Sequence, residues 1–323
     1  MNNGFEDRAL SLQALLGLNT FEDNTEQIFD TLTSLATKAM SYPVSYISLL
    51  HDKSQQRKAA SDLRFCEAES ETAFRSAAVS SGEQFYVEDT TTDARFSKLP
   101  QVTGPPYVRS YCSAPIFTRL GHPIGAFSVV DFIPRRPTAT ELISLQQFSQ
   151  LTTEIIELRA QAATDVLTGI PNRRAFLGAA NEIFAQAVLT NSSLSCVALD
   201  IDNFKNINDE WGHLAGDEVM KFVGHTLLMQ ANSSILPGRV GGEEFLLFAK
   251  EMPQGEVINL AEKIRKIFES SSATNHPPFT ASFGVAALSL KDVSVSDLIN
   301  RADEACYAAK KLGRNRVCVS EPY

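Results

Sequence analysis

The chain has few of the features that bind a nucleic-acid polymer or cross a membrane. Its 323 residues carry 29 Lys and Arg against 38 Asp and Glu, a formal net charge of −9. Without a basic surplus the chain cannot neutralise many phosphates, so we expect no nucleic-acid polymer as partner, although one or two nucleotides could still bind locally. No run of about 18 uninterrupted apolar residues occurs, which predicts no membrane span.

Cysteine is also sparse. The five cysteines include no C-x-x-C pair, a pattern that indicates reduced thiols in a reducing compartment. The N-terminal sequence lacks a basic stretch followed by a long apolar one, so no signal peptide is predicted. Together these absences predict a cytoplasmic location. The length and the ordinary globular composition, 44% hydrophobic and 21% charged, predict two domains.

Several common catalytic motifs are missing. We find no G-x-x-x-x-G-K-[ST] loop, no G-x-G-x-x-G opening a helix and no G-x-S-x-G elbow. The sequence therefore does not support a P-loop, a dinucleotide-binding fold or an α/β-hydrolase. The five histidines are isolated, so a zinc site has little support either. The informative segments are acidic and glycine-rich.

Apolar spacing predicts an α+β domain in the first half of the chain. We expect a helix over 23–40 and short strands at 44–50, 84–87, 113–117 and 125–130, separated by Pro, Gly and Asp clusters. A long helix over 140–163 follows. Its seam residues are spaced 3, 4, 3 and 4 apart, as in a coiled coil: Phe148, Leu151, Ile155, Leu158 and Ala162. Because the seam is short, a helix packed on its own domain is the alternative.

The second half alternates helices and strands. Gly169 and Pro171 end the long helix, so we place a domain boundary at Asp165. Beyond it we expect helices over 174–187, 217–229, 257–268 and 295–311, strands over 194–200 and 279–286, and a hairpin at Gly241-Gly242. The predicted fold class is α/β (α+β), with two domains that are each a mostly antiparallel sheet covered by helices, joined by a long linker helix.

An acidic cluster follows the strand expected at 194–200. An apolar strand that ends in carboxylates presents them at the sheet edge, where they can hold Mg²⁺. Asp200 and Asp202 would share one face if the strand extends that far. The alternative is an ordinary turn, since Asp and Asn are common turn residues.

The paired glycines predict a tight hairpin whose primed turn uses positive φ. Side-chain alternation places Glu243 and Glu244 on opposite faces, so that one of them could join Asp200 at a metal ion. Near the C-terminus, Lys310 and Arg314 flank Gly313. These cations either stabilise the end of a helix or bind triphosphate oxygens.

Taken together, five segments resemble the successive motifs of the GGDEF domain of diguanylate cyclases. They are DVLTGIPNRR (165–174), DIDNFKNINDEWGHLAGDE (200–218), RVGGEEF (239–245), ASFGV (281–285) and ACYAAKKLGRN (305–315). The resemblance implies a nucleotidyltransferase that joins two GTP molecules into cyclic di-GMP and releases two pyrophosphates. It also implies Mg²⁺, with Mn²⁺ as an alternative, and a dimer in which each domain holds one GTP.

The resemblance further assigns roles to residues at matching positions. Asp200, Glu243 and the backbone carbonyl of Ile201 would ligate the metal, and Glu243 and Glu244 form the catalytic acidic pair, whose division of roles stays open. The residues implied in substrate binding are Asn208 and Asp217 at the guanine, and Asn203, Phe204, Lys205, Lys310 and Arg314 at the β- and γ-phosphates.

One family feature is absent. Many members carry R-x-x-D shortly before the paired glycines, where product binds and inhibits, but the corresponding stretch here is Asn232-Ser233-Ser234-Ile235. We therefore expect feedback inhibition through this site to be absent or weak. Initial rates that fall steeply with added cyclic di-GMP would contradict this expectation, unless the product acted at another site.

The first half resembles a GAF sensory domain through VEDTTTDARFSKLPQV (87–102), GPPYVRSYCSAPIF (104–117) and GHPIGAFSVVDFIPR (121–135). This resemblance implies an unknown small ligand. Cys112 is followed by Ser, which argues against an attached bilin. The expected organisation is an extension over 1–21, a GAF domain over 22–139, a linker helix over 140–164 and the GGDEF domain over 165–323. We expect a homodimer through the GAF domain and linker helix, regulated by the GAF domain; a catalytically silent nucleotide receptor and a pure GAF sensor are the alternatives.

Overall fold

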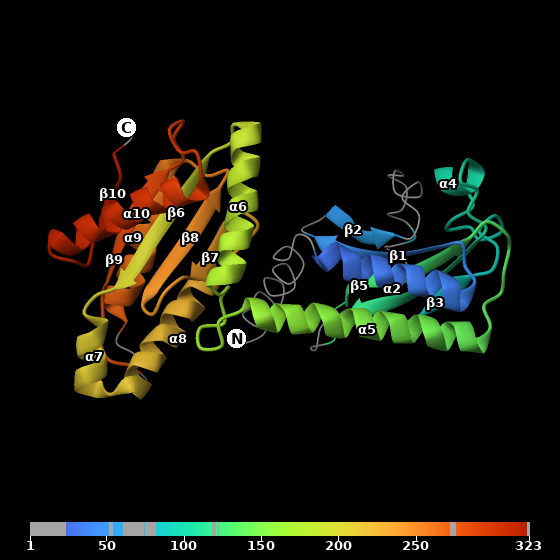
Figure 1. Cartoon of the computed structure of the whole chain (residues 1–323), viewed down its shortest axis with the longest axis horizontal. Helices are drawn as coiled ribbons and strands as arrows, with labels where there is room; N and C mark the ends of the chain where they lie inside the picture. Colours follow the sequence, from blue (N-terminus) through green and yellow to red (C-terminus); the bar gives the residue numbers. More distant parts are fainter. Residues whose placement is uncertain are drawn as a thin grey trace. The chain divides into compact units, whose positions relative to one another are not determined.

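The computed structural model describes residues 24–51, 54–60, 74, 82–117, 121, 123–271 and 276–321. These residues form two compact units that divide between Arg159 and Ala160 (Figure 1). Each unit contains one five-stranded sheet covered by helices, as expected. In the described part of the chain, no helix is both long and apolar enough to cross a bilayer.

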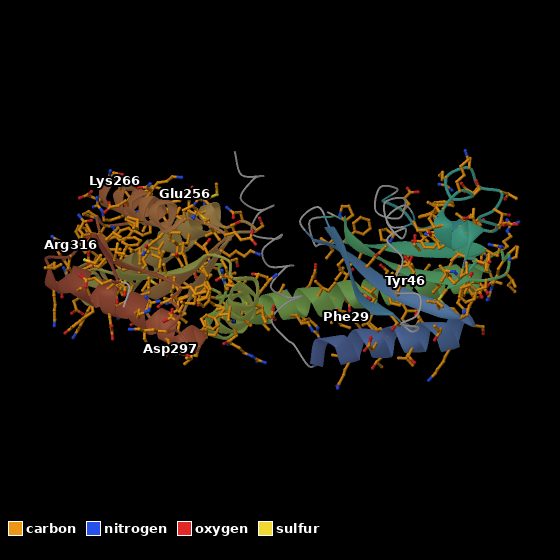
Figure 2. The ribbon with its side chains drawn as sticks, turned by 90° about the horizontal axis from the view of Figure 1, so that it is seen from above. Phe29, Tyr46, Glu256, Lys266, Asp297 and Arg316 are labelled. Atoms are coloured by element: carbon orange, nitrogen blue, oxygen red, sulfur yellow. The ribbon has the colours of Figure 1, made fainter. Side chains whose placement is uncertain are left out.

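The N-terminal unit has an antiparallel sheet in the order β2-β1-β5-β4-β3. Its elements are α2 (Asn24–Met40), β1 (Val44–His51), β2 (Ser54–Ala60), β3 (Phe85–Val87), α4 (Pro100–Thr103), β4 (Ser110–Phe117), β5 (Pro123–Asp131) and α5 (Ala139–Ala163). Helices α2 and α5 run side by side in Figures 1 and 2, and the guanidinium of Arg159 lies 5.2 Å from the ring centroid of Phe29.

Helix α5 presents two stripes. Leu145, Ser149, Thr152 and Ile156 are buried, with the spacing of a helix packed on its own domain. The seam residues behave differently: Leu151 is 43% exposed and Leu158 is 64% exposed, whereas Phe148 stacks on Phe127 with ring centroids 5.5 Å apart. Helix α5 therefore packs on its own unit and also leaves part of the expected seam uncovered.

The other face of this sheet carries an aromatic cluster. Phe74 stacks on Phe96 at 4.6 Å between centroids, and the buried Tyr111 hydroxyl shares a 2.9 Å hydrogen bond with Ser128. Cys112 lies on β4 and is buried, and its burial raises the pKa of the thiol to about 12. A thiol with so high a pKa is a poor nucleophile at neutral pH, which agrees with the argument against an attached chromophore.

The C-terminal unit has the sheet order β10-β9-β6-β8-β7, antiparallel except for the β9–β10 pair. Its elements are α6 (Arg173–Thr190), β6 (Leu194–Ile201), α7 (Phe204–Trp211), α8 (His213–Gln230), β7 (Ile235–Arg239), β8 (Glu244–Lys250), α9 (Gln254–Ser270), β9 (Ala281–Ala287), α10 (Val295–Lys311) and β10 (Val317–Val319). Helices α6 and α10 pack on one face of the sheet, and α8 and α9 pack on the other.

Four elements were not predicted from the sequence: β2, α4, α7 and β10. Strand β2 has the sequence SQQRKAA, which lacks the alternation of apolar residues that identifies a strand. Helix α7 has the sequence FKNINDEW, and its Asn and Asp residues indicate a turn when taken alone. Local patterns therefore missed edge strands and short helices whose formation depends on their neighbours.

Gly284 sets the distance between β9 and α10. A Cβ atom at this position would lie 2.1 Å from both the carbonyl oxygen of Ala302 and the backbone nitrogen of Cys306. Gly284→Ala is expected to lower the free energy of unfolding by about 3 kcal/mol, because overpacking that meets rigid backbone cannot relax easily. Chemical denaturation would measure this loss.

Gly255→Ala provides the control for this prediction. Gly255 lies in the first turn of α9, and nothing stands within 4 Å of a Cβ built there. Its replacement is expected to leave stability unchanged or to raise it by up to about 1 kcal/mol. Equal stability of the two variants would show that α10 does not need the close approach at Gly284.

Candidate functional site

Asp200 lies one residue before the C-terminal end of β6, the central strand of the C-terminal sheet. Its strand partners are Glu244 on β8 and Ser282 on β9. The ammonium of Lys310, on α10, lies 2.6 Å from Asp200 Oδ2, whereas Asp200 Oδ1 is buried and has no hydrogen-bond partner. Burial raises the pKa of Asp200 above its ordinary value, even though Lys310 lowers it. The residue is only 9% exposed, so one carboxylate oxygen is desolvated and available to a ligand.

The loop that carries Glu243 differs from the expected turn. Strand β7 ends at Arg239 and β8 begins at Glu244, so residues 240–243 connect them. Neither Gly241 nor Gly242 has a positive φ, so the predicted primed two-residue turn is wrong. Longer hairpin loops are most often built on type I turns, which do not require positive φ at two central residues.

Arg239 connects this loop to Asp165 through hydrogen bonds. Its guanidinium donates to the carbonyl oxygens of Gly241 at 3.2 Å and Gly242 at 2.8 Å, and to Asp165 Oδ1 at 2.9 Å. Although burial opposes it, hydrogen bonds from Thr168 and Arg239 hold the pKa of Asp165 below its ordinary value. The loop is therefore tied to the segment that directly follows α5.

Glu243 is brought next to Asp200. The backbone N–H of Ile201 donates to the carbonyl oxygen of Glu243 at 3.3 Å. Burial, and then the negative charge of Asp200, raise the pKa of Glu243, while Lys310 opposes them. The hydrogen bond to Ile201 and the effect of the Asp200 charge on Glu243 both indicate that Glu243 lies near Asp200.

A cavity of about 280 Å³ opens beside these carboxylates. The charged and hydroxyl side chains in its lining are those of Arg173, Asp200, Glu244, Asp303, Tyr307 and Lys310. Glu244, the strand partner of Asp200, therefore faces the same cavity as Asp200. Sequence reasoning missed Asp303, two residues before the ACYAAKKLGRN segment that it did identify. Partial desolvation, and then the charges of Glu244 and Asp200, raise the pKa of Asp303, whose side chain keeps contact with solvent.

The donor atoms at this edge suit a hard divalent cation. Among the described residues, no three His, Cys, Asp or Glu side chains already stand in metal-binding geometry. Mg²⁺, however, typically takes only one or two carboxylates and completes its octahedron with water and substrate phosphates. Asp200 Oδ1, the neighbouring Glu243 carboxylate and the Ile201 carbonyl are all oxygen donors, so the residues present fit Mg²⁺ or Mn²⁺.

The segment after β6 reverses direction at Asn203. Asn203 has φ of +54° and α7 begins at Phe204, so the amides of Asn203 and Phe204 lie at a helix N-terminus. The first N–H groups of a helix have no intrahelical partner and favour anions. Lys205 is exposed in the first turn of α7. These amides and the Lys205 ammonium are donors that suit phosphate oxygens, and the contacts themselves stay a prediction.

Asn208 and Asp217 come from two helices that pack together, α7 and α8. A Cβ atom at Gly216 would lie 2.0 Å from Asn208 Oδ1, so the Asn208 amide rests against α8 directly beside Asp217. Both side chains are half-buried. The structure therefore brings together the two residues expected to read the guanine edge.

Asp202 is not a second carboxylate for the metal. Asp202 would share a strand face with Asp200 only if β6 extended to it, and β6 ends at Ile201. Its two oxygens accept hydrogen bonds from Ser282 Oγ, Thr280 Oγ1 and the backbone N–H of Asn315. Of the three cations predicted at the phosphates, Lys310 contacts Asp200, whereas Lys205 in α7 and Arg314 in the turn after α10 are exposed.

The fold and the site define the C-terminal unit as an α/β domain with an acidic edge suited to a divalent metal. The profile of the family described as "Diguanylate cyclase, GGDEF domain" matches residues 162–316, and that of the GAF domain matches residues 24–156. The chain therefore carries a GAF domain followed by a GGDEF domain.

Several known proteins are similar to the C-terminal half. A diguanylate cyclase of Vibrio cholerae serotype O1 (strain ATCC 39541) is 39% identical over 189 residues, 55% of this chain and 57% of that protein. Diguanylate cyclase DgcM of Escherichia coli (strain K12) is 38% identical over 161 residues, 50% of this chain and 39% of that protein. The chain thus spans about half the length of the curated relatives it matches.

Among the similar solved structures is one that this chain matches over nearly the full length of that structure. It is the coiled coil and GGDEF domain of DgcB from Caulobacter crescentus, in complex with c-di-GMP. The TM-score is 0.51 at 32% sequence identity, and the match covers 56% of this chain and 97% of that chain.

Proposed function

We propose that this chain is a diguanylate cyclase that condenses two GTP molecules into cyclic di-GMP and two pyrophosphates. The observation that carries the proposal is the buried, unpartnered Oδ1 of Asp200 beside Glu243 and Lys310 at the sheet edge. The names of the relatives, including one solved with c-di-GMP, support the same product.

The protein's residues divide the work of positioning the substrate. Asn208 and Asp217 orient the guanine, while Lys205, Lys310, Arg314 and the amides of Asn203 and Phe204 hold the β- and γ-phosphates. In-line attack by a 3′-hydroxyl on the α-phosphorus requires this positioning, because alignment of the reacting groups supplies much of the rate. A bound Mg²⁺ or Mn²⁺, held by Asp200, Ile201 and Glu243, would neutralise charge on the phosphates and activate the attacking oxygen.

Glu243, at the end of the loop, and Glu244, at the start of β8, share two tasks: metal binding and acceptance of a proton. Glu243 is next to Asp200 and is assigned to the metal first. Glu244 lines the neighbouring cavity with Asp303. Either carboxylate can receive the proton of the 3′-hydroxyl, directly or through one water, provided that it lies within hydrogen-bond reach.

The direct test is to identify the product that the purified full chain makes from GTP and Mg²⁺. Chromatography is expected to show cyclic di-GMP with two pyrophosphates for each product molecule, and no product from ATP alone. GTP that binds without turnover would instead identify a catalytically silent receptor. A mixed adenine–guanine product from GTP with ATP would contradict the assignment of Asp217.

We assign residues 22–139 to the GAF sensory domain, 140–164 to the linker helix and 165–323 to the cyclase. A single GGDEF domain has one guanine-reading pair, Asn208 and Asp217, so joining two GTP molecules requires a second copy of the chain. A homodimer through the GAF domain and α5 would raise the effective concentration of the second half-site. An unidentified small ligand of the GAF domain would regulate this pairing.

The exposed part of the α5 seam gives a test of the dimer. Leu158→Glu is expected to raise the dimer dissociation constant at least about tenfold, because two like charges would meet and lose water across the seam. Sedimentation would measure the constant, and specific activity is expected to fall on dilution. Gln146→Glu adds the same charge at an exposed position elsewhere on α5 and is expected to leave both unchanged. Equal dissociation constants for the two variants would contradict the proposed interface.

A further inference from the structure

A strained turn follows α10. Gly313, Arg314 and Asn315 have φ values of +113°, +62° and +45° in succession. Residues other than glycine pay a steric cost in this region, although Asn tolerates it better than most. Such conformations persist only where the surrounding structure imposes them, and they concentrate at functional sites. The turn therefore has to be held in place by its neighbours.

Asn315 is held on three sides. Its backbone N–H donates to Asp202 Oδ2 at 3.0 Å, and its side-chain Nδ2 donates to Glu269 Oε1 at 2.7 Å. Its Oδ1 accepts from the Arg265 guanidinium at 2.8 Å. Arg265 is itself fixed, since it also donates to Glu262 and Glu269 on its own helix, α9. These bonds tie the turn to α9 and to the end of β6.

Asp202 connects the same turn to two other parts of the site. It is 5% exposed, and its carboxylate also accepts from Ser282 Oγ at 2.7 Å and from Thr280 Oγ1 at 2.7 Å. Its backbone N–H donates to the Thr280 carbonyl at 2.9 Å. Asp202 directly precedes Asn203, where the chain turns into α7. One buried carboxylate thus joins the start of α7, the beginning of β9 and the turn at Arg314.

We propose that Asp202 and Asn315, named here the Asp202–Asn315 clamp, are positioning residues for the triphosphate of the substrate. The clamp fixes the position of the exposed Arg314 guanidinium relative to the amides of Asn203 and Phe204. The guanidinium and the amides can then bind the β- and γ-phosphates of the same nucleotide. Asp202 acts through these groups and not on the substrate, because both of its oxygens are already occupied by donors. The inference rests on the proposed function only in taking a nucleoside triphosphate as the ligand.

The test compares two ligands that differ only in the β- and γ-phosphates. Asn315→Gly removes both side-chain bonds and keeps a residue that accepts positive φ. The dissociation constant for GTP is expected to rise about tenfold, because hydrogen bonds to charged groups are lost or misaligned. The constant for GMP is expected to stay within about twofold, since GMP lacks the phosphates that Arg314 binds. Equal weakening of GTP and GMP would overturn the proposal, because a merely structural role affects both ligands.

A double-mutant cycle shows whether the clamp acts through Arg314. Arg314→Ala alone is expected to weaken GTP binding at least as much as Asn315→Gly, and the double variant is expected to bind GTP no more weakly than Arg314→Ala. Independent, multiplying effects would overturn the proposal. Lys311→Ala removes a neighbouring exposed cation and is expected to leave the ratio of the two constants unchanged.

The same measurements separate this inference from the proposed function. A wild-type chain that binds GTP more tightly than GMP but makes no cyclic di-GMP would contradict the cyclase and leave the clamp supported by the cycle. A wild-type chain that binds the two nucleotides equally would overturn the clamp, whatever product it makes. Thermal unfolding of each variant shows that the ligands meet a folded domain.

Discussion

Glu243→Gln is expected to lower the rate of pyrophosphate release from GTP by at least about 10²-fold, measured as initial rates at saturating Mg²⁺. The substitution keeps the shape of the side chain and removes the negative charge next to Asp200. The loss should be large because a charged metal ligand acts in a partly desolvated site, where electrostatic interactions are worth more than in water. Asp200→Ala is expected to have an effect of similar size.

The folded state should tolerate the Glu243 substitution. Burial and the charge of Asp200 raise the pKa of Glu243, so its ionised form is disfavoured in the folded chain without a metal. Removing that charge is expected to leave the thermal midpoint unchanged or to raise it. Glu256→Gln, at an exposed position in the first turn of α9 (labelled in Figure 2), is expected to retain full activity. Activity that survived both Glu243→Ala and Asp200→Ala would defeat the metal assignment.

Asp217→Ala is expected to remove the preference for guanine over hypoxanthine. The Asp217 carboxylate can accept hydrogen bonds from guanine N1–H and from the 2-amino group, and inosine triphosphate lacks the 2-amino group. A hydrogen bond to a charged group is worth about 1.5–3 kcal/mol, so kcat/KM of the wild type should favour GTP over ITP by roughly 10- to 100-fold. In the variant this ratio should fall to about one.

Asp209→Ala is the matched control for base recognition. Asp209 is an exposed carboxylate on α7, next to Asn208 in sequence, so its removal changes the net charge equally without touching the guanine edge. Its GTP-to-ITP ratio should match that of the wild type. A preference for GTP that persists in Asp217→Ala would show that another group reads the 2-amino group.

Local sequence signals predicted the fold where an element carries its own boundaries. Helix α10 was expected over 295–311 and spans Val295–Lys311. Its start is fixed by a capping box in which Ser294 and Asp297 satisfy each other's backbone N–H groups, a signal that depends only on neighbouring residues. Elements fixed by tertiary contacts were missed, as in α7, whose helix depends on packing against α8.

The motifs identified most residues of the candidate site, but they did not predict how these residues are arranged in space. The sequence placed Asp200, Glu243 and Lys310 in separate segments, and the structure brings them to one edge of the sheet. The sequence did not reveal that Asp202 faces Ser282 and Thr280, because those partners lie about 80 residues further along the chain. The sequence also predicted the wrong turn type at Gly241-Gly242, because two glycines do not determine the turn type of a loop that is longer than two residues.

The central claim is that Asp200 and Glu243 share one divalent cation beneath a nucleoside triphosphate. A crystal structure of the chain grown with Mn²⁺ and a non-hydrolysable GTP analogue, with anomalous scattering at the manganese edge, tests this claim most directly. We predict an anomalous peak within about 2.0–2.3 Å of a carboxylate oxygen of each residue and of a phosphate oxygen of the nucleotide, the spacing of a small hard cation. A manganese peak that contacts the nucleotide but lies out of reach of either carboxylate would contradict the account.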